Sequence, residues 1–187
     1  MNISNSIFVN RIIRACKLDT SLYEEVEADQ SATLQAAIVV VLSSLAAGVG
    51  ALSLGASNFL YAPILSLFSW YIWAYLIYFI GAKLFPESLF DKDTNTWTVV
   101  TKTNHGELLR TIGFSSAPGI IRVFGFTPEL MSLTFISSAI WMLVAMVIAV
   151  RQALDYSSTW RAIGVVLIGF LTQAVILVFI MKIYAGA

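Results

Sequence analysis

Charged residues are scarce in this chain, and their scarcity excludes several classes of protein. Only 12% of the 187 residues are charged, whereas about a quarter is usual for a soluble domain. Hydrophobic residues make up 58% of the chain, and the mean hydropathy is +0.82. The formal net charge is zero, so no basic field is available to bind nucleic acid. The composition excludes a disordered chain, a nucleic-acid-binding protein and an ordinary soluble enzyme, and it indicates a membrane protein.

The sequence also lacks most residue types from which catalytic and metal sites are built. His105 is the only histidine and Cys16 the only cysteine, so neither a pair of histidine ligands nor an internal disulfide is possible. The common nucleophile, dinucleotide-binding and phosphate-binding motifs are absent. We therefore expect no enzyme, no metal and no cofactor, and we interpret His105 as a solvated loop residue.

Long uncharged stretches predict the membrane spans. No residue from Ser31 to Ala82 is charged, and 52 residues of helix would rise about 78 Å, enough to cross a hydrocarbon core of about 30 Å twice. The turn between the two crossings is expected at Gly55–Asn58. Two further uncharged stretches are each long enough for one span. The four clear spans lie at about 34–55, 64–82, 130–150 and 162–183.

A fifth apolar segment, residues 108–126, is less regular. It contains Arg110 and Arg122 near its ends and Gly113 and Pro118 between them, so hydropathy alone also allows a re-entrant or interfacial segment. Lys and Arg prefer the cytoplasmic side of short loops. With a cytoplasmic N-terminus, five spans place nine of the 11 basic residues in the cytoplasm, whereas four spans place eight there. We therefore expect five spans.

Residues 1–33 form a cytoplasmic segment in this interpretation. Apolar residues between Ile3 and Cys16 recur at spacings of three and four, which predicts an amphipathic helix on the membrane surface or on the protein's own loops. The following stretch, Asp19–Gln30, contains five acidic residues. Because anionic lipid repels acidic residues, we expect this stretch to face protein, either its own loops or a partner.

The acidic stretch and the connector between the last two spans are the candidate partner-binding face. Arg151 and Asp155 stand four residues apart and would pair if the helix continued. We also expect Arg151 or Arg161 to pair with an acid of the N-terminal segment. The candidate residues are Tyr23, Glu24, Glu27, Asp29, Arg151, Asp155 and Arg161.

The clear spans offer packing surfaces in place of ionisable groups. Small residues recur on the first span from Ser44 to Gly55, which favours close helix packing, more often within the chain than with a partner. Gln173 is the one strongly hydrogen-bonding side chain in the middle of a clear span, and we expect it to form an interhelical hydrogen bond. An ion-coupled transporter is disfavoured.

Three stretches resemble the Yip1-domain family of small membrane proteins. The sequence from Tyr23 to Asp29, followed by Ala32–Ala36, is similar to the Tyr-x-Glu-Val start of prokaryotic members. Residues 108–118 resemble the Gly-Tyr/Phe-x-x-x-Pro third span, with the candidate motif Arg110, Gly113, Phe114, Pro118 and Arg122. Residues 140–154, with Trp160–Ala162, resemble the fourth span and connector. The Asp-Leu-Tyr-Gly-Pro motif and the long N-terminal arm of eukaryotic members are absent.

The resemblance implies a five-span membrane domain over residues 34–187, a cytoplasmic N-terminus and the cytoplasmic (inner) membrane of a prokaryote. It implies no particular chemistry, because prokaryotic members have none assigned. The expected fold is an all-α polytopic membrane bundle of five transmembrane helices preceded by an amphipathic helix.

Two functional hypotheses follow. The first is a non-enzymatic scaffold, adaptor or accessory subunit that binds another membrane or membrane-associated protein through its cytoplasmic face. The alternative is a permease-like protein that handles lipid or a small molecule, with the broken third span lining a cavity. In that case Arg110 and Arg122 would meet anionic head groups. The two hypotheses differ in whether these arginines converge on one buried polar cavity.

Overall fold

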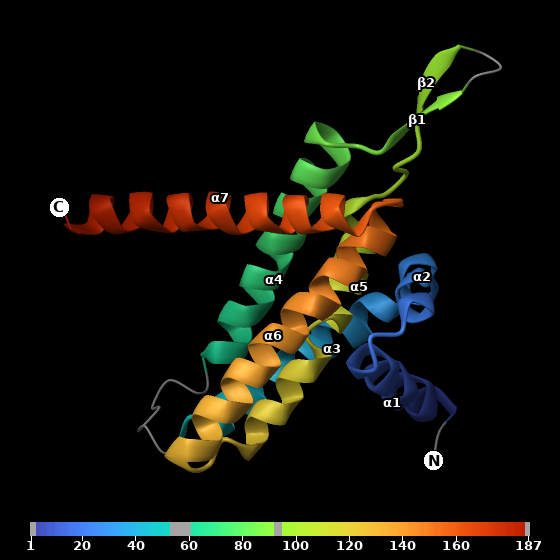
Figure 1. The fold of residues 1–187 in the computed structure, drawn as a ribbon. Helices are drawn as coiled ribbons and strands as arrows, with labels where there is room; N and C mark the ends of the chain where they lie inside the picture. Colours follow the sequence, from blue (N-terminus) through green and yellow to red (C-terminus); the bar gives the residue numbers. More distant parts are fainter. Residues whose placement is uncertain (1–2, 53–60, 92–94, 186–187) are drawn as a thin grey trace.

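Long apolar helices dominate the computed structural model, which describes residues 3–52, 61–91 and 95–185 (Figure 1). Four helical segments of this part of the chain are long and apolar enough to cross a membrane: Ala32–Gly50, Ala62–Leu84, Pro128–Ala153 and Thr159–Ile176. They belong to α3 (Ala32–Gly50), α4 (Ala62–Tyr78) with its π-helical end η2 (Phe79–Leu84), α6 (Pro128–Ala153) and α7 (Thr159–Ala185). The protein is thus a helical, multi-pass membrane protein, and each clear predicted span corresponds to one of these segments. The turn predicted at Gly55–Asn58 lies outside the described residues.

The segment expected to form the third span is broken into two short helices. α5 (His105–Phe114) begins at a capping box, in which the Asn104 side chain accepts a hydrogen bond from the Glu107 backbone and the Glu107 side chain accepts one in return. The 3-10 helix η3 (Ala117–Phe124) follows, with Pro118 in its first turn, where a missing N–H is tolerated. Because neither piece alone is long enough to cross a membrane, the count of five spans stays a prediction.

Small residues bring this broken segment against α3. A Cβ on Gly113 would lie 2.6 Å from the Cβ of Ala36, and one on Gly119 would lie 2.0 Å from the Oγ of Ser43. A Cβ on Gly50 would likewise lie 2.0 Å from a backbone oxygen of η3. The three α3 positions are seven residues apart, so they share one helix face. These small residues therefore pack within the chain, but at positions of α3 that differ from the expected small face through Ser44 and Ala47.

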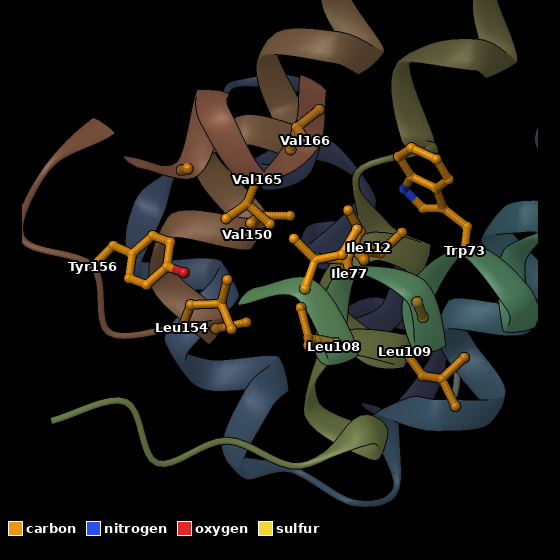
Figure 2. Packing of buried hydrophobic residues seen from close by; sticks show 14 residues of the cluster. Trp73, Ile77, Leu108, Leu109, Ile112, Val150, Leu154, Tyr156, Val165 and Val166 are labelled. Atoms are coloured by element: carbon orange, nitrogen blue, oxygen red, sulfur yellow. The ribbon is translucent and has the colours of Figure 1, made fainter. Parts of the chain in front are cut away.

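Two hydrophobic clusters hold the helices together. In the first, side chains from α4, α5, α6 and α7 converge, and Figure 2 shows Ile77 in the centre, close to Ile112 and Leu108, with Trp73 at one side. The second joins α3, η3 and α6 to two N-terminal helices, α1 (Ile3–Cys16) and α2 (Thr20–Ala28). α7 lies across α4, and its C-terminal part runs away from the other helices (Figure 1).

The N-terminal helix α1 packs on the protein itself. Its Ala15 is completely buried, and Phe8 and Ile12 contact the second hydrophobic cluster. Of the two placements that the sequence left open, packing on the protein's own elements is therefore observed. The other face of α1 exposes Ile7 and Ile13.

A short hairpin that the sequence analysis did not anticipate follows α4. Strands β1 (Ser88–Asp91) and β2 (Thr96–Val99) are antiparallel, with Phe90 opposite Trp97. The β2 sequence alternates threonine with a tryptophan and a valine, residue types that favour strands. The hairpin projects beyond the end of α4 (Figure 1).

Candidate functional site

The acidic helix α2 is docked into the fold. Leu22, Tyr23 and Val26 have no exposed surface, and they pack in the second hydrophobic cluster. Burial also raises the pKa of the Tyr23 hydroxyl. Tyr23, one of the candidate partner-binding residues, therefore contacts the interior of the protein.

Two arginines of α1 form ion pairs with acidic residues of α2. Arg11 donates hydrogen bonds to Glu25 (2.9 Å) and Asp29 (2.8 Å), and Arg14 also donates to Glu25. Hydrogen bonds from Ser31 and then from Arg11 hold the pKa of Asp29 below its ordinary value. Asp29, a second candidate for partner binding, is thus engaged within the chain.

Arg110 of α5 anchors the C-terminal end of α2. Its side chain is buried, and it donates from Nε to the Val26 carbonyl oxygen (2.8 Å) and from Nη2 to that of Glu27. The last carbonyls of a helix lack intrahelical donors and carry the negative end of the helix dipole, so a guanidinium stabilises them. Arg110 therefore positions α2 on α5.

Glu27 lies close to two other acidic residues, Glu107 and Asp155, and to Arg110. Burial, followed by the charges of Glu107 and Asp155, raises the pKa of Glu27 to about 7. Arg110 opposes this shift but does not cancel it. Glu27 and Asp155, both candidates from the sequence, thus lie near each other as like charges.

The predicted ion pair between the connector and the acidic stretch is wrong. Arg161 pairs instead with the buried Glu87 (3.0 Å). Arg151 donates to the Thr159 hydroxyl (3.0 Å) and to carbonyl oxygens of the connector. The connector does lie beside α2, because the Gln152 amide donates to Glu24 (2.8 Å).

The pair expected between Arg151 and Asp155 also fails, because the helix stops too early. α6 ends at Ala153, and Asp155 adopts a left-handed conformation with φ of 53°. A side chain in that conformation does not continue the helical spacing on which an i, i+4 pair depends.

A cavity of about 280 Å³ with both polar and apolar lining residues lies among the long helices. It is bordered by residues of α3, α4, α5, η3, α6 and α7, so the whole bundle contributes to it. We call it the lateral cavity. Its polar lining residues are Ser43, Ser44, Ser66, Ser69, Ser116, Arg122 and Gln173.

The lateral cavity opens between α4 and α7. Among its lining residues, those that are exposed are Ser69 of α4 and Phe170 and Gln173 of α7. The other lining residues are buried or half-buried. A molecule in the surrounding lipid would therefore enter from the side of the bundle.

Arg122 is the one charged residue among those that line the lateral cavity. Its Nε donates to the Ser138 hydroxyl (2.6 Å), its Nη2 lies 3.4 Å from the Met142 sulfur, and its guanidinium carbon lies 5.4 Å from the Phe135 ring centre. These partners are all on α6, and none is a carboxylate. Among the described residues, Arg122 forms no salt bridge.

The Arg122 side chain reaches the middle of α6. Ser138 and Met142 flank the midpoint of this 26-residue helix, about 15–21 Å from its first residue at 1.5 Å per residue. Arg122 reaches this depth from η3 and not from a spanning helix, and a charged side chain in the interior of a membrane bundle is costly. Arginines at such positions usually mark a binding or transport path.

The serine and glutamine side chains of the lateral cavity on α3, α4 and α7 form no hydrogen bond to another helix in the described part of the chain. Ser43 is 4% exposed, and its hydroxyl forms no hydrogen bond within the described residues. Ser44 and Ser66 donate only to carbonyls of their own helices, at 3.0 and 2.8 Å. The interhelical hydrogen bond expected for Gln173 is not formed in the described part of the chain.

The sequence analysis missed this group of serines. Its signal was present, since Ser43 and Ser44 are adjacent in one uncharged span and Ser66 and Ser69 are one helical turn apart in another. Serine is common in membrane helices, however, and its spacing does not show which helix it faces.

His105 is not a solvated loop residue, as the sequence had suggested. It is the first residue of α5, and its ring lies 4.8 Å from the Tyr71 ring and 5.6 Å from the Tyr75 ring, measured between centres. Both ring nitrogens are buried and have no hydrogen-bond partner in the described structure. His105 does not line the lateral cavity. The described residues contain no group of three or more His, Cys, Asp or Glu side chains that could hold a metal ion.

No family model, curated protein or solved structure matches the chain.

Proposed function

We propose that this membrane protein binds a lipid or another small amphiphile in the lateral cavity. The observation that carries the proposal is a cavity that contains Arg122, is bordered by all the long helices and opens between α4 and α7. A charged side chain inside a membrane bundle is costly, and one such as Arg122 usually contacts a ligand or lines a path.

The cavity has the mixed lining that an amphiphile requires. Serine hydroxyls and Arg122 provide polar contacts, while Trp70, Trp73, Phe170 and Met146 provide an apolar wall. Binding sites for small molecules are typically apolar with a few polar groups that fix orientation. A volume of about 280 Å³ suits a head group with the first part of its chain better than a whole phospholipid.

The two arginines of the broken segment have separate tasks in this proposal. Arg110 is occupied by the carbonyls of α2, whereas Arg122 lines the lateral cavity. They do not converge on one cavity, so only Arg122 takes the ligand-binding role considered for both. The broken segment still lines the cavity, through Ile112, Ser116 and Arg122.

The scaffold hypothesis stays a prediction. Burial of Tyr23 and the ion pair of Asp29 leave fewer groups of the acidic stretch free for a partner. Membership of the Yip1-domain family, a cytoplasmic N-terminus and a prokaryotic inner membrane also stay predictions. The proposed binding activity depends on none of them.

Blocking the opening of the lateral cavity tests the proposal. Ser69→Trp places a large ring at the exposed edge of the cavity. The control is Phe68→Trp, which puts the same indole ring at the neighbouring position, where Phe68 is 66% exposed and does not line the cavity. Native mass spectrometry after purification in a mild detergent should show bound lipid on the wild type and on Phe68→Trp, but not on Ser69→Trp. Equal lipid retention by the two variants would contradict the proposal.

A further inference from the structure

We infer that the lateral cavity selects an amphiphile with an anionic phosphate or carboxylate group, and that Arg122 binds this group. The inference rests on the proposed function and adds the chemical class of the ligand. Its basis is a guanidinium at the cavity wall with unused donors and no acidic partner.

The donors of Arg122 are only partly used. A guanidinium has five N–H donors in a planar fork. Ser138 accepts one from Nε, and the Met142 sulfur, a weak acceptor, accepts one from Nη2. Three donors therefore have no acceptor in the described residues, and Nη1 supplies two of them.

The charge of Arg122 is uncompensated within the cavity. None of the lining residues is an aspartate or a glutamate, so the lining carries one positive charge. A cation removed from water is stabilised by an anion or by hydrogen-bond acceptors. Neutral serine hydroxyls supply acceptors but no charge, so an anionic ligand completes the site.

Phosphate and carboxylate fit the unused fork. Arginine binds both groups through two parallel N–H···O bonds, and these charge-assisted bonds are about twice as strong as neutral ones. Ser43 of α3 also lines the cavity, and its hydroxyl, which forms no hydrogen bond within the described residues, is a further donor there. The apolar wall then accommodates the start of a hydrocarbon chain.

Backbone packing fixes the position of Arg122, and this packing does not depend on the charge of its side chain. Its backbone lies against Gly50 of α3, so closely that a Cβ there would lie 2.0 Å from the Arg122 carbonyl oxygen. A substitution that removes only the charge is therefore expected to leave the fold in place.

The test measures lipid selectivity in nanodiscs. The wild type, Arg122→Gln, Arg122→Lys and Lys17→Gln are placed in bilayers of equal parts phosphatidylcholine and phosphatidylglycerol, and bound lipid is identified by native mass spectrometry. Lys17→Gln is the matched control, because Lys17 is an exposed cation outside the cavity. Oleate and methyl oleate, compared in the same way, separate a carboxylate ligand from a phospholipid.

The wild type should enrich phosphatidylglycerol or oleate roughly tenfold over its neutral counterpart. Arg122→Gln should still bind lipid but lose this preference, Arg122→Lys should keep part of it, and Lys17→Gln should keep all of it. A wild type that binds both lipid classes equally would overturn the inference without any variant, and so would a preference that survives in Arg122→Gln. A wild type with no bound lipid would instead overturn the proposed function.

Discussion

Gly119 of η3 lies against Ser43 of α3 so closely that a Cβ on the glycine would come within 2.0 Å of the serine hydroxyl oxygen and 2.9 Å of the Met142 sulfur. This contact brings η3, which carries Arg122, between α3 and α6. It therefore connects the packing of the bundle with the position of the proposed site.

Gly119→Ala should destabilise the bundle by about 1–3 kcal/mol, because the added methyl group overpacks a well-filled contact. Thermal loss of the folded peak in size-exclusion chromatography measures the change. Gly164→Ala is the control, since nothing lies within 4 Å of a Cβ at that position in α7, and it should be neutral or slightly stabilising. Adding Ser43→Gly to Gly119→Ala should recover part of the loss, and a double variant as unstable as the single one would contradict this account.

Arg110→Met should release α2 while leaving lipid selectivity unchanged. The substitution leaves the Val26 and Glu27 carbonyls without their charged donor, which costs about 1.5–3 kcal/mol per hydrogen bond. Faster proteolysis in residues 17–30 of the folded protein reports the release. Arg151→Met, which removes an arginine bonded to carbonyls of the more exposed connector, should have the smaller effect.

Arg161 should be energetically coupled to Glu87 and not to Glu24. A double-mutant cycle with Arg161→Met and Glu87→Gln should give a coupling energy of about 0.5–3 kcal/mol, as expected for groups in contact. The same cycle with Glu24→Gln should give a coupling near zero. The reverse ranking would restore the ion pair that the sequence suggested and refute the observed one.

Glu27 should make the protein less stable as the pH rises from about 4.5 to about 7. Its pKa is raised in the folded state, so the folded protein holds a proton that the unfolded chain has already released. Thermal unfolding as a function of pH should lose this decline in Glu27→Gln, with a stability gain at and above pH 7. Asp29→Asn is the control of opposite sign, because the lowered pKa of Asp29 contributes stability that is lost as the pH falls. An unchanged pH profile in Glu27→Gln would contradict the raised pKa.

The long helices could be read from the sequence because charge is excluded from hydrocarbon, and uncharged runs therefore mark them directly. The packing partners of the small residues could not be predicted from the sequence. The expected small face ran through Ser44 and Ala47, whereas the closest contacts form at Ala36, Ser43 and Gly50. The direction in which a helix faces is set by its neighbours, and the first span has small residues on more than one side.

The partners of the charged side chains could not be predicted from the sequence either. Arg151 and Arg161 had several acids to choose from, and the choice depends on a turn at Asp155 and on a hairpin that places Glu87 beside the connector. Hydropathy showed Arg122 near the end of the apolar segment 108–126, which the structure divides into α5 and η3. It could not show that the side chain reaches the middle of α6, because that depends on the contact between η3 and its neighbours.

Photolabelling with an anionic phospholipid tests the central claim most directly, because it locates the head group. One probe carries a photoreactive group on the head group and a second carries it at the end of an acyl chain. If the lateral cavity binds the anionic group at Arg122, the head-group probe should label residues midway along the helices, such as Trp70 and Met142, and Arg122→Gln should strongly reduce this labelling. Head-group labelling confined to the helix ends, with only the acyl-chain probe reaching the middle, would contradict the account.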